Sequence, residues 1–447
     1  MENCKKAVDK NKNLIIDAFN YIWNNPETGY KEWKTHNYLK NAFLSLGYDL
    51  TEAGNIPGFC AEVDTGKIGP TILVFAEMDA LVIPSHPDAD PETGAVHACG
   101  HCTQTASVLG VAAAIKEPGM LDGLCGKIRF VVVPAEESIE MEYRNELVEK
   151  GIIKYKSGKV EFLYRGMLDG ADLAFMIHAY VGKKHSGSMN GGSNGLIVKS
   201  AEFQGVSAHA GGCPHDGINA LYAANTALNA INALRETFKD SDHIRVHPVV
   251  SCGDTSVNAI PDNVSFETFV RGATMDSAVE ANKKINRAIA ASAAAIGAKV
   301  RISDRGMMWP RWTDRTMFSV FKQAMESVLE TTDCNVDRWG TGSSDIGDIS
   351  GLMPMVQAYV GGAAGNEHGS DYRIADVDTA CVDSAKIQLI AIRLLLENEA
   401  GIAKQATELY HPYFRNKKEY FAFADNIQRE FDAVIYEENG NVVLNLN

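Results

Sequence analysis

Hydrophobic residues recur along this chain at two spacings, one typical of helices and one typical of strands. Ile15, Phe19 and Ile22 recur at helical spacing and predict a first helix, and a second helical stretch runs from 32 to 46. Short apolar runs bounded by turn residues predict strands, and an Ala-rich helix is predicted among them at 103–115. The predicted strands are 58–63, 71–76, 127–133 and 172–177. This alternation indicates an α/β fold.

The runs TILVFA and IRFVVV are apolar almost throughout, whereas a half-buried strand alternates between apolar and polar positions. Continuous apolar runs are typical of parallel strands that helices cover on both faces. We therefore expect a mostly parallel sheet flanked by helices.

From about residue 191 the pattern changes to half-buried strands and Ala-rich helices. The order is β-α-β-β-α-β, which is typical of a small ferredoxin-like domain. Its clearest elements are strands at 196–203, 263–271 and 298–303 and helices at 219–237 and 277–296. A helix at 316–329, a strand at 355–360 and a long helix at 380–397 then return to the first domain. We expect a catalytic domain of residues 1–190 and 304–447 with 191–303 inserted; the segment 410–447 suggests no function.

Polar residues that can bind metal or move protons follow four predicted core strands. Asp79 follows the first, Glu136 and Glu137 follow the second, His178 follows LAFMI, and His368 follows MVQAYV after a Gly-rich loop. Ligands of open α/β sheets bind at the carboxyl ends of the strands. Each residue alone has an ordinary structural explanation, but together they indicate one site at this edge.

Cys99 and His101 stand two residues apart, immediately before a predicted helix. Thiolate and imidazole are good ligands for zinc and similar divalent ions. With Glu137, His178 and His368, these residues offer enough ligands for two metal ions. Glu136 and Glu137 point in opposite directions if they continue the strand, so one can bind metal while the other faces a water molecule.

A competing interpretation is that Cys99-Gly100-His101-Cys102 is the disulfide-exchange motif of a thiol oxidoreductase. Such a motif usually follows an aromatic residue in a compact domain, whereas His97-Ala98 precede it here in a long chain. It also leaves the glutamate pair and the strand-end histidines without a role. A second alternative is a noncatalytic binding protein on the same fold.

Composition narrows the choice of partners and location. The formal net charge of −15 over 447 residues argues against nucleic acid as a partner, because binding phosphates requires clustered Lys and Arg. Nine scattered cysteines do not resemble a secreted disulfide framework, so reduced thiols are expected. No apolar run has the length of a membrane span or a signal-peptide core. We expect a cytoplasmic protein without a membrane partner.

These residues lie in segments that resemble a family of metallo-amidohydrolases and metallopeptidases that includes aminoacylase, glutamate carboxypeptidase, indole-acetyl-amino-acid hydrolase and aminobenzoyl-glutamate hydrolase. The segments are AEMDAL at 76–81, HACGH at 97–101, PAEES at 134–138, IHAY at 177–180, GVSAHAGGCPHDGINAL at 205–221, VNAIPDN at 257–263, GSSDIGDIS at 342–350 and NEHGSDY at 366–372. The Cys-Gly-His segment and the run before His368 look closest to the aminobenzoyl-glutamate hydrolase branch.

The resemblance implies a co-catalytic zinc-peptidase-like fold whose inserted domain is a lid that also forms a homodimer. It implies one or two divalent ions, zinc or manganese with cobalt possible, bound by the five ligands named above. The implied reaction is hydrolysis of an amide bond in a small N-acyl amino acid, an aminobenzoyl-glutamate-like compound or a dipeptide, with Glu136 as the base that activates a metal-bound water.

The resemblance also implies roles for residues outside the ligand set. Asp79 matches an acidic residue that supports the metal site. His209 matches a lid histidine that reaches the partner subunit's active site and stabilises the oxyanion, and Asn258 and Arg271 match residues that contact substrate. Cys102 and Val82 depart from the family's usual Asp or Asn and Pro, and the segments 83–96 and 148–165 look longer than usual. These departures leave the ligands intact but weaken any inference about the substrate.

Overall fold

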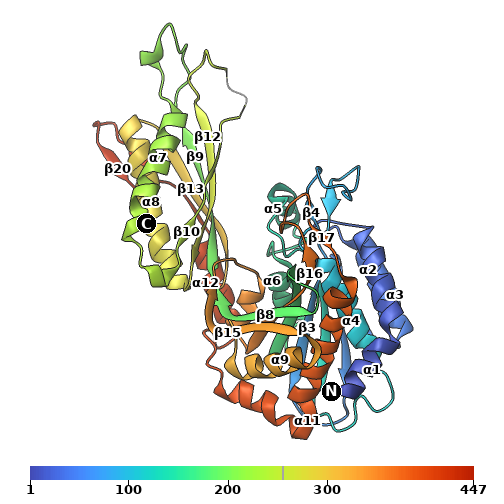
Figure 1. The fold of residues 1–447 in the computed structure, drawn as a ribbon. Helices are drawn as coiled ribbons and strands as arrows, with labels where there is room; N and C mark the ends of the chain where they lie inside the picture. Colours follow the sequence, from blue (N-terminus) through green and yellow to red (C-terminus); the bar gives the residue numbers. More distant parts are fainter. Residues whose placement is uncertain (254–255, 447) are drawn as a thin grey trace. The chain divides into compact units, whose positions relative to one another are not determined.

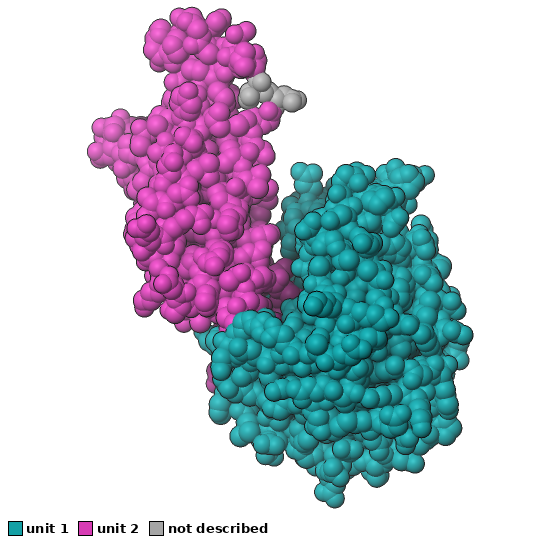
Figure 2. All heavy atoms as spheres, in the orientation of Figure 1, with its two compact units in different colours: residues 1–192, 312–338, 348–413 teal, residues 193–311, 339–347, 414–447 magenta. Residues whose placement is uncertain are grey.

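A computed structural model describes residues 1–253 and 256–446 of the chain. These residues form two compact units, each built from segments that are distant in sequence (Figure 2). Unit 1 comprises Met1–Gly192, Trp312–Arg338 and Asp348–Tyr413. Unit 2 comprises Ser193–Arg311, Trp339–Gly347 and Phe414–Asn447.

The first part of unit 1 alternates helices and strands, as the hydrophobic pattern predicts. Its helices are α1 (Glu2–Lys10), α2 (Lys12–Trp23), α3 (Trp33–Ser45), α4 (His101–Ala114), α5 (Met141–Glu149) and α6 (Gly158–Tyr164). Its strands are β1 (Leu50–Glu52), β2 (Phe59–Asp64), β3 (Thr71–Glu77), β4 (Leu81–Val82), β5 (Ala95–Val96), β6 (Lys127–Val133), β7 (Leu173–Val181) and β8 (Ser186–Ser193).

The later elements of the main sheet and its helices follow the inserted unit. They are β14 (Arg311–Trp312), α9 (Arg315–Val328), β15 (Thr331–Gly340), α10 (Ile346–Ser350), β16 (Met355–Ala364), β17 (Arg373–Ile374), a π-helical turn (Asp378–Asp383) and α11 (Ser384–Leu409). In the described part of the chain, ten strands form the main sheet, ordered β1-β2-β6-β3-β7-β16-β8-β14, with β15 beside β8 and β17 beside β16.

The four central strands of this sheet are parallel and its outer strands are antiparallel. β6, β3, β7 and β16 pair in parallel, whereas β2 runs antiparallel to β6 and β8 antiparallel to β16. The sheet is thus mixed, with a parallel centre. All seven residues of β3 are buried, because α4 packs against β3 and β7 and is itself covered by α2 and α11 (Figure 1). The parallel centre brings the carboxyl ends of four strands to one edge.

Unit 2 has the predicted alternation of strands and helices, but its described residues form three strands rather than two between the two long helices. Its elements are β9 (Gly195–Gln204), α7 (Ala220–Leu234), β10 (Arg245–Val246), β11 (Val249–Ser251), β12 (Asn263–Gly272), α8 (Met275–Ile296) and β13 (Lys299–Met308). The sheet order is β10-β12-β9-β13-β18, with β11 also beside β12, and α7 and α8 lie side by side against it (Figure 1). Strand β13 is ten residues long because it pairs with β9 along that strand's length, so it extends beyond the predicted 298–303.

The C-terminal segment does not follow the domain boundaries expected from the sequence, which assigned all of 304–447 to the first domain. Phe414–Asn447 belongs to unit 2, where it forms α12 (Lys417–Ile427), β18 (Arg429–Asp432), β19 (Val434–Tyr436) and β20 (Val442–Leu444). Strand β18 pairs with β13, and the Phe414 ring packs 4.7 Å from that of Trp309. These contacts attach the segment to unit 2.

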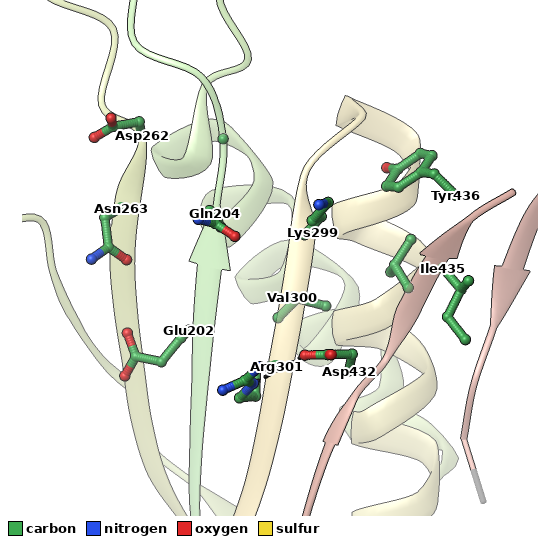
Figure 3. A pocket seen from close by; sticks show the side chains of 12 residues that line it. Glu202, Gln204, Asp262, Asn263, Lys299, Val300, Arg301, Asp432, Ile435 and Tyr436 are labelled. Carbon is green, nitrogen blue, oxygen red and sulfur yellow. Dashed lines mark hydrogen bonds and ion pairs between the residues drawn. The ribbon is translucent and has the colours of Figure 1, made fainter. Parts of the chain in front are cut away.

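A groove of about 940 Å³ lies in unit 2 beside the edge that the C-terminal segment forms (Figure 3). Mostly polar side chains line it, among them Glu202, Lys299 and Arg301, and Arg301 Nε donates to Asp432 Oδ1 at 3.0 Å. Among the described residues, no predicted ligand or base lines this groove. Among the same residues, no helix is both long and apolar enough to cross a membrane.

Candidate active site

The carboxyl edge of the parallel strands in unit 1 brings the predicted residues together. Asp79 follows β3, Glu136 and Glu137 follow β6, and His368 follows β16. His178 differs from the prediction, because it lies inside β7 rather than beyond its end. Strand β7 continues to Val181, since β16 keeps pairing with it past this histidine.

His101, the first residue of α4, is fully buried and held by Asp79. Its Nδ1 lies 2.9 Å from the Asp79 backbone carbonyl oxygen and 3.0 Å from Asp79 Oδ1. A carbonyl oxygen only accepts, so Nδ1 carries the proton and donates it. Burial opposes the charge of Asp79, but His101 and the Glu137 N–H hold the pKa of the Asp79 carboxyl well below its usual range. Burial opposes a charge on the ring, but Cys99, Glu77 and Asp79 raise the pKa of His101 well above its usual value. Its Nε2 therefore offers a lone pair to a metal ion only in the neutral ring.

The two glutamates occupy a tight turn after β6 rather than an extension of the strand. Ala135 has φ of 55°, a left-handed conformation that non-glycine residues rarely adopt. Two hydrogen bonds hold the turn in place. The Ala135 N–H donates to Glu32 Oε1 at 2.9 Å, and the Glu137 N–H donates to Asp79 Oδ2 at 2.9 Å. Because the chain turns here, Glu136 and Glu137 both come close to His101 instead of pointing to opposite sides.

Arg144 fixes the same turn through its guanidinium group. It is 1% exposed, donates through Nη2 to the Glu137 carbonyl oxygen, and donates through Nη1 to the Lys156 carbonyl oxygen at 3.0 Å. We expect Arg144→Met to lower kcat/KM by about 10–100-fold, as loss of a supporting contact commonly does at metal sites. Arg144→Lys, which keeps the charge and one donor, should recover part of the loss. Steady-state kinetics and unfolding midpoints of both variants test this, and wild-type kcat/KM in Arg144→Met would contradict it.

The five predicted ligands and Glu136 offer metal-binding atoms in overlapping groups. Within each group the candidate atoms lie within 4.8 Å of one another. Three groups contain the predicted ligands: Cys99–His101–His178, Cys99–Glu137–His368 and His101–Glu136–Glu137. A fourth group includes Glu77 and Glu136. Cys99 Sγ is 3.5 Å from His178 Nε2, and His368 Nε2 is 3.3 Å from Glu137 Oε1. Cys99, His101 and Glu137 each belong to two groups, so the set has room for more than one ion.

The chemistry of these donors fits divalent metal ions. His101 Nε2 and Glu137 Oε1 are buried and make no regular hydrogen bond with the described residues, although Glu77 Oε2 and His368 Nε2 lie 3.2 and 3.3 Å from them, respectively. His178 Nδ1 donates to the Ala179 carbonyl oxygen at 2.6 Å, which leaves its Nε2 facing Cys99. Burial and the neighbouring His101 lower the pKa of His178, which favours the neutral form that binds metal. Buried polar atoms that lack a hydrogen bond, as His101 Nε2 and Glu137 Oε1 do, are costly unless a cation binds them.

The sequence interpretation missed a buried group beside this set. Glu77, the last residue of β3, is 1% exposed, and its Oε2 lies 3.2 Å from His101 Nε2. Lys159 of α6 is fully buried and donates to Glu77 Oε1. Glu77 stands two residues before Asp79, so the side-chain alternation of β3 was a usable signal for it. The segment that carries Lys159 had no such signal.

Two of the predicted residues of unit 2, His209 and Asn258, lie in neighbouring segments. The Ala210 N–H donates to the Asn258 carbonyl oxygen at 2.8 Å, and His209 forms a β-bridge with Ala259. His209 is exposed, and its Nδ1 accepts the N–H groups of Gly211 and Gly212 at 3.1 and 3.0 Å. The neutral ring therefore carries its proton on Nε2, where it can donate to a substrate oxygen. Asn258 is exposed, whereas Arg271 donates to Ser343 Oγ at 2.7 Å. Their contacts with substrate stay predictions.

The disulfide-exchange interpretation finds no support in the site. Cys99 and Cys102 are both free thiols and both buried. Cys99 packs with Tyr372 and faces His178, whereas Cys102 packs into the main hydrophobic core. Burial raises the pKa of Cys102 to about 12, and a thiol that stays protonated is a poor nucleophile.

Comparisons with known proteins agree with this geometry. Indole-3-acetyl-aspartic acid hydrolase of Enterobacter agglomerans is 31% identical over 262 residues, 56% of this chain and 55% of the relative. One of the two subunits of the p-aminobenzoyl-glutamate hydrolase of Escherichia coli is 28% identical over 278 residues, 60% of this chain and 53% of the relative. The chain thus spans about half the length of these two curated relatives.

Solved structures share the fold. The crystal structure of a dinuclear metal-binding peptidase of the M20 family from Bacillus subtilis superimposes with a TM-score of 0.64 at 20% identity, covering 88% of this chain and 99% of that one. The model of peptidase family M20/M25/M40 matches residues 73–391, which include every predicted ligand and the predicted base. The resemblance drawn from the sequence motifs is confirmed: the chain belongs to peptidase family M20/M25/M40.

Proposed function

We propose that this protein is a metal-dependent hydrolase of an amide bond in a small N-acyl amino acid, an aminobenzoyl-glutamate-like compound or a dipeptide. The observation that carries the proposal is the convergence, at one edge of the sheet, of five side chains that can bind metal, with Glu136 beside them. The names of the relatives, which denote hydrolysis of amide-linked amino acids, support the substrate class.

Cys99, His101, Glu137, His178 and His368 would hold one or two divalent ions, zinc or manganese, with cobalt as a further candidate. Such an ion would lower the pKa of a water molecule toward neutrality and polarise a carbonyl oxygen. Asp79 keeps the His101 ring oriented by accepting a hydrogen bond from its Nδ1–H group.

Glu136 acts as the general base in this proposal. It takes a proton from the attacking water and returns it to the leaving amine as the tetrahedral species breaks down. His209 Nε2–H donates to the oxyanion of that species, and Asn258 and Arg271 contact the substrate's polar groups. This division of roles makes Glu136 essential for turnover but dispensable for binding.

A substrate panel tests the proposal. N-acyl amino acids, aminobenzoyl-glutamate and short dipeptides are incubated with the protein, with and without a chelator, and release of free amine is measured. Hydrolysis that the chelator abolishes and added metal restores supports the proposal. Bound metal without hydrolysis of any compound favours the noncatalytic binding protein, and hydrolysis that ignores the chelator contradicts metal dependence.

His209→Ala is expected to lower kcat by roughly 10²–10³-fold, the usual cost of losing an oxyanion donor. His215→Ala is the matched control, because His215 is an exposed histidine of the same loop region and is expected to be replaceable. Initial rates at saturating substrate measure the effect. Equal rates in the two variants would remove His209 from the mechanism.

A homodimer formed through unit 2 is part of the proposal, with His209 acting in the partner's site. Mixing the inactive variants Glu136→Gln and His209→Ala then regenerates one intact site in each mixed dimer, or about a quarter of the wild-type rate after random exchange. If the hydrolytic rate did not recover after verified subunit exchange, His209 would act in its own subunit's site.

A cytoplasmic location stays a prediction from the sequence.

A further inference from the structure

Glu77 is the centre of a buried network next to the predicted ligands. Lys159 Nζ donates to its Oε1, Gln104 Nε2 donates to its Oε2 at 2.6 Å, and the Glu77 backbone N–H donates to Gln104 Oε1 at 3.3 Å. All three residues are at most 1% exposed. Two of these hydrogen bonds hold the carboxylate in one position, and the third ties the backbone of Glu77 to Gln104.

The held carboxylate points at a ligand atom. Glu77 Oε2 lies 3.2 Å from His101 Nε2, whereas Nδ1 of the same ring contacts Asp79. Two ligands bound ~2.0–2.1 Å from one tetrahedral ion are about 3.3 Å apart. The pairs Cys99–His178 and Glu137–His368, at 3.5 and 3.3 Å, have similar separations. Glu77 and His101 are thus spaced like two ligands of one ion.

The free-energy cost of burying the ion pair between Lys159 and Glu77 also needs an explanation. Burying a lysine and a carboxylate costs several kcal/mol per ion, and an apolar pair of similar volume is often as stable. Oε2 accepts from Gln104 and, as a carboxylate oxygen, has a second lone pair that can bind a cation. A role for the Glu77 charge at the metal explains why the carboxylate is kept here and why Lys159 is placed to hold it.

We propose that Glu77 is a sixth metal-binding residue of this site, sharing the ion bound by His101 Nε2, and that Lys159 and Gln104 are positioning residues that keep its carboxylate in place. This inference rests on the proposed metal dependence. It adds to the five ligands an acidic group from the end of β3, and it gives the buried lysine a function.

The test separates a metal role from a purely structural ion pair. The double variant Glu77→Gln/Lys159→Met removes both charges together, so neither partner is left buried and unpaired. The metal dissociation constant is measured by competition with a chromophoric chelator, the visible absorption spectrum is recorded with cobalt bound, and the unfolding midpoint is measured without metal. The matched control is Asp304→Asn/Lys199→Met, which removes a second buried lysine–carboxylate pair, in unit 2.

We expect the Glu77 double variant to bind metal about 10–100-fold more weakly, with a changed cobalt spectrum and a metal-free unfolding midpoint close to wild type. The control should bind metal like wild type. Wild-type affinity and spectrum in the Glu77 double variant would overturn the inference while leaving the proposed function intact; a wild-type protein that binds no metal would overturn the proposed function itself.

A second variant keeps the inference testable if the double variant does not fold. Glu77→Asp keeps the charge balance with Lys159 but draws the carboxylate back from His101 by one methylene. We expect weaker metal binding in this variant too, by about 10-fold or more. Unchanged affinity and an unchanged cobalt spectrum in Glu77→Asp would exclude Glu77 as a ligand.

Discussion

Replacing Glu136 with glutamine is expected to lower kcat by roughly 10²–10⁴-fold, the contribution typical of a general base. Glutamine has nearly the same shape but cannot accept a proton at neutral pH. Glu136 shares its surroundings with Glu137 and His101, so its carboxylate is within reach of a water molecule held by the same set. The metal content and the unfolding midpoint of the variant should stay close to wild type.

The matched control for this variant is Glu140→Gln. Glu140 belongs to the same loop but forms an ion pair with Lys31 at 2.7 Å and belongs to none of the metal-binding groups found among the described residues. Its replacement should leave kcat within a few-fold of wild type. Single-turnover rates with both variants measure the chemical step directly, and a Glu136→Gln rate equal to that of the control would show that another residue accepts the proton.

Cys99→Ala is expected to have the second largest effect, because Cys99 belongs to two of the groups that can hold an ion. Loss of the thiolate should lower the bound metal per chain, with the hydrolytic rate falling in parallel. Metal content by elemental analysis and the initial rate, measured on the same preparation, test this. Full metal occupancy in Cys99→Ala would remove Cys99 from the ligand set.

Cys102→Ala distinguishes the metal interpretation from thiol chemistry. Cys102 is fully buried in the core, so its replacement should cost about 1 kcal/mol of stability and leave metal content and rate unchanged. A disulfide-exchange protein would instead need both thiols. If Cys102→Ala lost activity as completely as Cys99→Ala while remaining folded, the thiol mechanism would be favoured.

The regular core was the most predictable part of the fold. The strand predicted at 127–133 has those bounds in the structure. A continuous apolar run between turn residues is typical of a central strand that is buried on both faces of an α/β sheet. The segment after residue 413 could not be predicted in the same way. Strand β18 is only four residues long and half exposed, so its conformation comes from pairing with β13 rather than from its own pattern.

The candidate site was predictable where its residues follow strands. The carboxyl ends of parallel strands meet at one edge, so Asp79, Glu137 and His368 could be grouped from their positions alone. The pairing of Glu77 with Lys159 could not, because 82 residues separate them and nothing local marks Lys159 as buried. In the sequence, the segment 148–165 that carries Lys159 stood out only by its apparent length, whereas the structure buries Lys159 in α6.

Metal back-titration tests the central claim most directly. The protein is stripped with a chelator, one divalent ion is added in steps, and amide hydrolysis of the best substrate is measured against bound metal per chain. We expect no hydrolysis without metal and a rate that rises with occupancy and saturates at one or two ions per chain. Full hydrolysis by verified metal-free protein would contradict the account.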